Sequence, residues 1–168
     1  MKNLWLTFGG NTKTLLEGYC NLDWASQAHH HSISGFSFHY GSGAIYWSWK
    51  KQNIVALSST ESEYVALTHA GKEAVWLKTF VSEIANQKIG PLTIADNNQG
   101  SLDLAKDNKF HSRTKHIDLR YHFIREAVEG KEIKLEYVPT GDNITDIFTK
   151  ALAQPNFVEM LGLADKNK

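Results

Sequence analysis

The sequence has a single cysteine, only three prolines and no excess of either charge among its 168 residues. The lone Cys20 excludes an internal disulfide and a cysteine-based zinc site. Basic and acidic residues number 18 each, so the overall charge gives no sign of a nucleic-acid partner. No run approaches the roughly 18 apolar residues of a membrane helix, and the first residues lack the long apolar segment typical of a signal peptide. We therefore expect an intracellular protein.

The composition is that of an ordinary globular protein. Its 42% hydrophobic and 21% charged residues supply enough apolar material for one core. The length is typical of a single domain of roughly 100 to 200 residues. There is no internal repeat or low-complexity tract. These features exclude the collagen-like, disordered and coiled-coil classes.

The first half of the chain predicts three strands and a long helix. Aromatic and β-branched residues punctuated by glycines predict hairpin-linked strands near 15–22, 33–40 and 44–50. The hydrophobic period then changes to alternating steps of three and four, which predicts a helix over about 61–86. Ser58 stands three residues before a glutamate, a capping-box pattern that marks the helix start. The apolar stripe of this helix is Leu67, Ala70, Ala74, Leu77, Val81 and Ile84.

The second half predicts strands that alternate with helices. Asn97 or Asn98 is expected to cap a helix that reaches about Lys106. Gly130 ends the next helix, and Gly141 opens a last one. The expected strands are 92–95 and 133–138, and the helix between them covers 115–129. This order predicts a mixed α/β sheet covered by helices.

Three acidic residues occupy unusual places. A step of four back from the helical stripe puts Glu63 on the face expected to be buried, where it serves either the helix cap or chemistry. Asp96 stands where a strand ends and a helix begins, an edge at which ligands collect, although alone it is more often a turn or cap residue. Asp146 falls in the first turns of the last helix, where a negative charge also suits the helix dipole.

Asn21 and Asp23 lie two residues apart on a predicted strand and therefore share one face. Carboxylates that converge from separate elements, without cysteine, form an oxygen-rich site. Such a site favours Mg²⁺ or Mn²⁺ over zinc, and these ions commonly act on phosphates.

A basic segment lies between residues 106 and 125, with six cationic residues against two acidic ones. Its candidates for phosphate contact are Arg113, Thr114, Lys115 and His116, at the start of a predicted helix. A solvated helix face is the alternative. Lys50 and Lys51, which follow a strand, are weaker candidates. The tryptophans Trp24, Trp47, Trp49 and Trp76 are expected in the core or on a sheet face, because a duplex offers few unstacked bases.

Six sequence blocks in order carry the most specific signal. They are Gly18–Ala25 (GYCNLDWA), Ser34–Phe36 (SGF), Trp47–Gln52 (WSWKKQ), Leu57–Tyr64 (LSSTESEY), Arg113–His122 (RTKHIDLRYH) and Asp146–Lys150 (DIFTK). Together they closely resemble the ribonuclease H domain of copia-type LTR retrotransposon polyproteins, which follows the reverse transcriptase in Pol. The resemblance covers about residues 15–155.

This resemblance implies a ribonuclease H-like fold: a five-stranded mixed sheet, three strands antiparallel and two parallel, with helices on both faces. Residues 1–14 would be a lead-in from the preceding polyprotein segment, 15–155 the domain and 156–168 a tail. The implied activity is hydrolysis of the RNA strand of RNA–DNA hybrids by two Mg²⁺ or Mn²⁺ ions. The implied partners are the hybrid and the reverse transcriptase domain, with a monomeric isolated domain that resides in cytoplasmic retrotransposon particles.

By the same resemblance, Glu63, Asp96 and Asp146 supply three of four metal-binding carboxylates. The fourth position, usually aspartate, is Asn21, which lacks the negative charge that draws two dications together. Asp23 is a potential substitute, but its Cα lies about 6 to 7 Å further along the strand. The sequence therefore leaves two hypotheses: a nuclease with reduced or lost activity, or an inactive domain that binds hybrid or packs against a reverse transcriptase.

Overall fold

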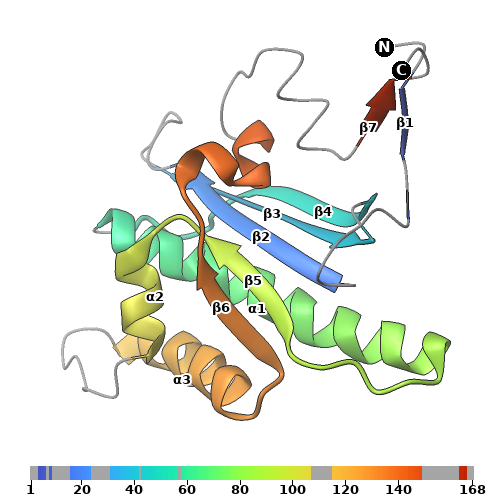
Figure 1. Ribbon diagram of the computed structural model, residues 1–168. Helices are drawn as coiled ribbons and strands as arrows, with labels where there is room; N and C mark the ends of the chain where they lie inside the picture. The colour runs from blue at the N-terminus through green and yellow to red at the C-terminus, as the bar shows by residue number, and fades with distance from the viewer. Residues whose placement is uncertain are drawn as a thin grey trace.

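The computed structural model describes residues 4–6, 8, 16–23, 31–41, 43–56, 58–106, 115–148 and 163–165. Strands β2 (Leu16–Asp23), β3 (Ile33–Tyr40) and β4 (Gly43–Lys51) form an antiparallel meander. Strands β5 (Leu92–Asp96) and β6 (Ile133–Tyr137) continue the sheet in parallel with β2. The strand order is β4-β3-β2-β5-β6 (Figure 1), which confirms the predicted five-stranded mixed sheet.

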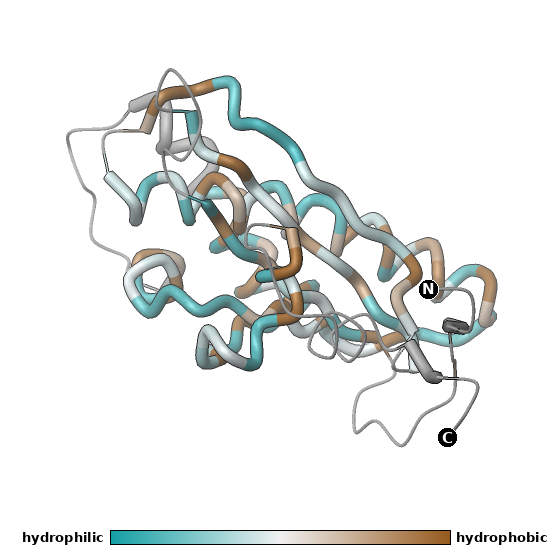
Figure 2. The backbone as a smooth tube through the Cα atoms, turned by 90° about the horizontal axis from the view of Figure 1, so that it is seen from above, coloured by the Kyte–Doolittle hydropathy of each residue, from teal (hydrophilic) through white to brown (hydrophobic). Residues whose placement is uncertain are grey.

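Helix α1 (Ser59–Ala85) begins where its capping signal predicts. The backbone N–H of Glu61 donates to Ser58 Oγ at 3.1 Å, which satisfies one of the unpaired amides of the first turn. Hydrophobic and hydrophilic residues are interspersed along α1 (Figure 2), and its apolar stripe faces the sheet. Leu67 and Ala70 at the centre of this stripe are fully buried.

Two shorter helices complete the layer on this face of the sheet. Helix α2 (Gln99–Lys106) follows Asn98, whose Oδ1 accepts from the backbone N–H of Ser101 at 3.1 Å. Helix α3 (Lys115–Glu129) packs on α1. Both helices contribute to one hydrophobic core with α1 and the strands, through Leu102 and Ile124 among others. The core therefore lies between the sheet and the three α-helices of the described residues.

The prediction of a last α-helix that opens at Gly141 is wrong over the described residues. The chain instead forms two 3₁₀ helices, η1 (Thr140–Asp142) and η2 (Ile144–Phe148). The side chain of Asn143, between them, accepts from the backbone N–H of Thr145 at 3.1 Å. This local bond competes with regular α-helical pairing. The short helix η2 contacts β2 and β3 on the side of the sheet opposite α1 (Figure 1).

Several apolar side chains expected inside are exposed. Ile84 is 71% exposed because α1, with 27 residues, is about 40 Å long and extends beyond the strands that it covers. Trp47, Trp49 and Trp76 are more than half exposed, so none of them belongs to the core. Trp47 and Trp49 do lie on a sheet face, on edge strand β4. Trp24 lies outside the described residues.

A second, two-stranded sheet pairs β1 (Leu4–Leu6) with β7 (Leu163–Asp165) in antiparallel fashion. It brings segments near the two ends of the chain side by side (Figure 1). Among the helices in the described part of the chain, none combines the length and the apolar character needed to cross a membrane.

The close approach of Phe38 to Gly18 makes the core sensitive to any larger residue at position 18. A Cβ added to Gly18 would lie 2.5 and 2.7 Å from two ring atoms of Phe38, which is fully buried. We expect Gly18→Ala to lower the free energy of unfolding by about 1 to 3 kcal/mol, measured by urea denaturation. Gly90→Ala is the control, because nothing lies within 4 Å of its added Cβ. Equal stability of the two variants would contradict this packing.

Candidate active site

The carboxylate of Asp96, the last residue of β5, is fully buried at the end of the strand. Its Oδ2 accepts from Ser101 Oγ at 2.6 Å, and its Oδ1 accepts from the backbone N–H of Asn98 at 3.1 Å. Burial raises the pKa of Asp96 to about 6, although these hydrogen bonds favour the charged form and lower it. Asp96 thus accepts hydrogen bonds from Asn98 and from Ser101 at the start of α2, as a capping residue does, and its carboxyl group has a raised pKa.

Glu63 brings a second carboxylate to the same place from the first turns of α1. Its side chain is partly buried and accepts a hydrogen bond from the side chain of Asn98. Burial, and after it the negative charge of Asp96, raises the pKa of Glu63 to about 8. The prediction that Glu63 lies on the buried face of α1 is therefore confirmed, and its carboxyl group lies close enough to Asp96 for the charge of Asp96 to act on it.

Cys20 is a neighbour of this pair that sequence reasoning missed. In the parallel ladder between β2 and β5, Cys20 stands opposite Asp96, so the two side chains share the α1 face of the sheet. The thiol is buried and donates to the Asp96 carboxylate. Burial, followed by the charges of Asp96 and Glu63, raises the pKa of Cys20. Only the register between two strands that are distant in sequence reveals this contact.

Asn21, the next residue, points to the opposite face of the sheet. It pairs with Gly35 of β3, and the Phe148 side chain of η2 packs over Gly35, 3.3 Å from where a Cβ would be. On this face Asn21 Nδ2 donates to Asp146 Oδ1 at 2.5 Å, although the two residues are 125 positions apart. The site thus consists of two pairs, Glu63 with Asp96 and Asn21 with Asp146.

Asn143 holds the second pair in place, a role that no sequence motif indicates. This fully buried side chain donates through Nδ2 to the backbone carbonyl of Cys20 at 2.8 Å. Its own backbone carbonyl accepts from the N–H of Asp146 at 3.0 Å. Asn143 therefore ties η2 to β2 beside Asn21.

The remaining candidates lie around these pairs or outside the described residues. Asp23 ends β2 on the same face as Asn21 and is partly buried. Lys50 and Lys51 are exposed at the end of β4. Lys115 and His116 form the start of α3, whose first side chains are outside the description, as are Arg113 and Thr114. The described residues contain no group of three or more histidine, cysteine, aspartate or glutamate side chains placed to hold a metal ion.

Comparison with known sequences gives retrovirus-related Pol polyproteins that match most of this chain. No family model matches the chain. The retrovirus-related Pol polyprotein from transposon TNT 1-94 of Nicotiana tabacum is 40% identical over 153 residues, 90% of this chain. The corresponding polyprotein from transposon RE2 of Arabidopsis thaliana is 36% identical over 158 residues, 92% of this chain. The chain spans 11% of the length of each of these curated relatives.

Comparison with solved structures gives ribonucleases H. The RNase H1 of Halobacterium salinarum NRC-1 superposes with a TM-score of 0.58 at 14% identity, covering 79% of this chain and 92% of that one. LC11-RNase H1, solved in complex with an RNA/DNA hybrid, superposes with a TM-score of 0.55 at 13% identity and the same coverage. At these identities the likeness concerns the fold. The chain belongs to the copia-type, retrovirus-related Pol polyproteins, and corresponds to a segment of them with the ribonuclease H fold.

Proposed function

We propose that this domain is an endonuclease that hydrolyses the RNA strand of RNA–DNA hybrids. The observation that carries the proposal is the pair of carboxyl groups, Glu63 and Asp96, which come from separate elements to the end of β5. Burial raises the pKa of both, and the charge of Asp96 further raises that of Glu63, so a bound cation would favour their ionised forms. The ribonuclease H fold and the Pol relatives support the same substrate class. Cleavage of a labelled hybrid, with single-stranded RNA and duplex DNA as controls, tests it.

The donors present fit a hard divalent cation at the first pair. Glu63 and Asp96 offer carboxylate oxygens, and no cationic side chain among the described residues neutralises them. Mg²⁺ or Mn²⁺ would be held by these two residues, with Asp146 and Asn21 as the proposed ligands of a second ion. The ions would supply activation of water and charge stabilisation of the leaving oxygen. Asn98 and Ser101 orient the two carboxylates through their hydrogen bonds.

The pKa of Glu63 predicts how stability varies with pH. The folded-state pKa is about 8 against an ordinary 4.5, so between these values the folded protein keeps a proton that the unfolded chain has released. Without metal, the melting temperature is therefore expected to fall as the pH rises through this window and to level off above it. Glu63→Gln should flatten the profile, whereas Glu83→Gln, on an exposed residue, should not.

Millimolar Mg²⁺ should raise the melting temperature more above the pKa of Glu63 than below it, because the cation binds the ionised pair. Differential scanning fluorimetry measures both effects without reference to activity. A metal-induced shift that does not depend on pH, or that survives Glu63→Gln, would contradict a cation at this pair.

One observation favours a second function, a hybrid-binding domain that does not cleave. The Asn21 amide donates to Asp146 and so engages a carboxylate oxygen that a second ion would need. An amide also lacks the negative charge that attracts a dication. If Asn21 and Asp146 remain hydrogen-bonded to each other and bind no ion, the domain would bind hybrid without cutting it, or pack against the reverse transcriptase domain of the same polyprotein. Asn21 therefore decides between the two functions.

Asn21→Asp is expected to raise Mg²⁺-dependent cleavage of hybrid by at least an order of magnitude, about 1.4 kcal/mol of activation free energy. Two carboxylates at positions 21 and 146 repel each other and attract an ion in place of the amide hydrogen bond. The parent should be slow and prefer Mn²⁺, which tolerates an imperfect ligand set better than Mg²⁺ does. Single-turnover kinetics with both metals measure the difference.

Asp23→Ala separates the two interpretations of this strand. If Asp23 replaces the missing carboxylate, its removal abolishes residual cleavage and Asn21→Asp gains little. If Asp23 is structural, the residual rate survives its loss. A parent that already cleaves as fast with Mg²⁺ as Asn21→Asp would refute an impaired site.

The basic segment supplies the proposed contact to the phosphate backbone. Helix α3 begins at Lys115, and the first backbone N–H groups of a helix have no partner within the helix, which suits phosphate binding. We expect Arg113→Ala with Lys115→Ala to weaken hybrid binding and to reduce its salt dependence, measured by fluorescence anisotropy at several ionic strengths. Replacement of two exposed lysines elsewhere, Lys88 and Lys134, is the matched control. Equal losses in both double variants would mean that net charge, not this segment, determines binding.

A further inference from the structure

A row of exposed side chains runs along β4 on the face of the sheet opposite α1. Trp47, Trp49 and Lys51 alternate with residues of the other face, and the two tryptophans are 59% and 53% exposed. Neighbours in the row stand about 7 Å apart, the length of two strand residues. The register shift of β4 precedes the row, so the row pairs regularly with β3. The row is therefore a continuous surface of two aromatic rings that ends in a cation.

This row lies beside the second pair of the candidate site. Gly35 of β3 pairs with Asn21 on one side and with Trp49 on the other, so these three residues lie side by side across three strands. Trp49 is thus two strand spacings, about 10 Å, from Asn21. The partly buried side chain of Phe148 packs over Gly35. The row therefore continues toward the Asn21–Asp146 pair through a third aromatic ring.

The charge of the row suits a phosphate backbone. Strand β4 contains no acidic residue, and its charges are Lys50 and Lys51 at the C-terminal end. Both lysines are exposed, and neither is ion-paired with a described residue. Exposed aromatic rings on a sheet face with cations beside them are the features with which proteins bind single-stranded nucleic acids, because bases stack on the rings and phosphates meet the cations.

The occupant of such a surface has to be unpaired. The bases of a duplex stack on each other and offer few free faces to a tryptophan. In the proposed reaction the RNA strand must reach the carboxylate pairs to be cut, so the strand that passes beside them is the DNA strand. Hydrolysis of the RNA also leaves the DNA without its partner. Single-stranded DNA that continues from the hybrid therefore fits both the rings and the reaction.

We propose that Trp47, Trp49 and Lys51 bind the unpaired DNA strand next to the hybrid, with bases stacked on the two indole rings and a phosphate at the lysine. The choice of DNA rests on the proposed function, whereas binding of a single strand does not require cleavage. This surface would hold the domain on its substrate as the hybrid shortens.

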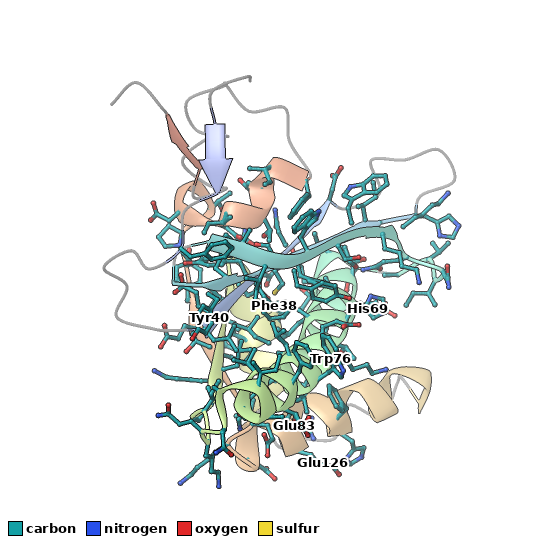
Figure 3. The ribbon with its side chains drawn as sticks, turned by 90° about the vertical axis from the view of Figure 1, so that its right-hand side faces the viewer. Phe38, Tyr40, His69, Trp76, Glu83 and Glu126 are labelled. Atoms are coloured by element: carbon teal, nitrogen blue, oxygen red, sulfur yellow. The ribbon has the colours of Figure 1, made fainter. Side chains whose placement is uncertain are left out.

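Binding of tailed and blunt hybrids in EDTA tests this surface without metal-dependent cleavage. The probe is an RNA–DNA hybrid whose DNA strand continues, at either end, into a short oligothymidine tail, and fluorescence anisotropy measures its affinity. We expect the tail to tighten binding at least about fivefold and Trp49→Ala to remove that gain. Trp76→Ala is the matched control, because Trp76 is also 53% exposed but lies on α1, on the other side of the sheet (Figure 3). Equal losses in both variants, or no loss in either, would overturn the proposal.

The outcomes separate this surface from the proposed nuclease. A domain that cleaves hybrid but gains nothing from the DNA tail would refute the surface and leave the nuclease standing. A gain that depends on Trp49 in a domain that does not cleave would support the surface and count against the nuclease. An RNA tail with an equal gain and the same dependence on Trp49 would overturn the assignment to DNA.

Tryptophan fluorescence gives an independent measurement. Stacking of a base on an indole ring quenches its emission, so oligothymidine should quench the parent chain more than Trp49→Phe. This variant keeps an aromatic face and should retain most of the gain from the tail. Trp76→Phe is the control, and its quenching by oligothymidine should match that of the parent. Quenching that is unchanged by Trp49→Phe would show that no base stacks on this ring and would overturn the proposal.

Discussion

The arrangement of the site depends on one constraint, the burial of the Asp96 carboxylate at the end of β5. A buried carboxylate must be hydrogen-bonded or paired with a cation, or it takes up a proton. Here the Ser101 hydroxyl, the Asn98 amide and the Cys20 thiol supply the donors. Those three groups come from the start of α2, the loop before it and the neighbouring strand. The hydrogen bonds to Asp96 therefore tie the end of β5 to the start of α2 and to β2.

The central position of β2 allows one strand to serve both faces of the sheet. It pairs in parallel with β5 and antiparallel with β3, so its C-terminal end lies where the strand directions change. Successive residues point to opposite faces, and Cys20 contacts the pair on the α1 side while Asn21 contacts Asp146 on the η2 side. The two halves of the candidate site are thus separated by a single peptide of β2.

A polar network fixes the first turn of α1, and with it the position of Glu63. Gln52, which directly follows β4, is almost fully buried. Its Nε2 donates to Ser34 Oγ at 2.8 Å and to the backbone carbonyl of Ser62 at 2.9 Å. Ser62 also accepts from Ser32 Oγ at 3.1 Å. These bonds join the sheet to the residue before Glu63, so the carboxylate is oriented by neighbours that take no part in the proposed chemistry.

Local sequence determined the five strands of the main sheet, the N-terminal caps of α1 and α2 and the α/β class, because hydrophobic period and capping residues act within a few positions. It also placed Glu63 on the sheet side of α1 and Asp96 at a strand end. It did not predict β1 and β7. Tertiary structure alone decided the rest. The segment around Asp146 is held against β2 by the bond from Asn143 to Cys20, 123 residues away, and by the Asn21–Asp146 bond, which spans 125 residues. The exposure of Trp47 and Trp49 follows from the edge position of β4. The raised pKa of Asp96 follows from its burial, and that of Glu63 from its burial and from the nearby charge of Asp96, and no sequence period encodes such a meeting of distant groups.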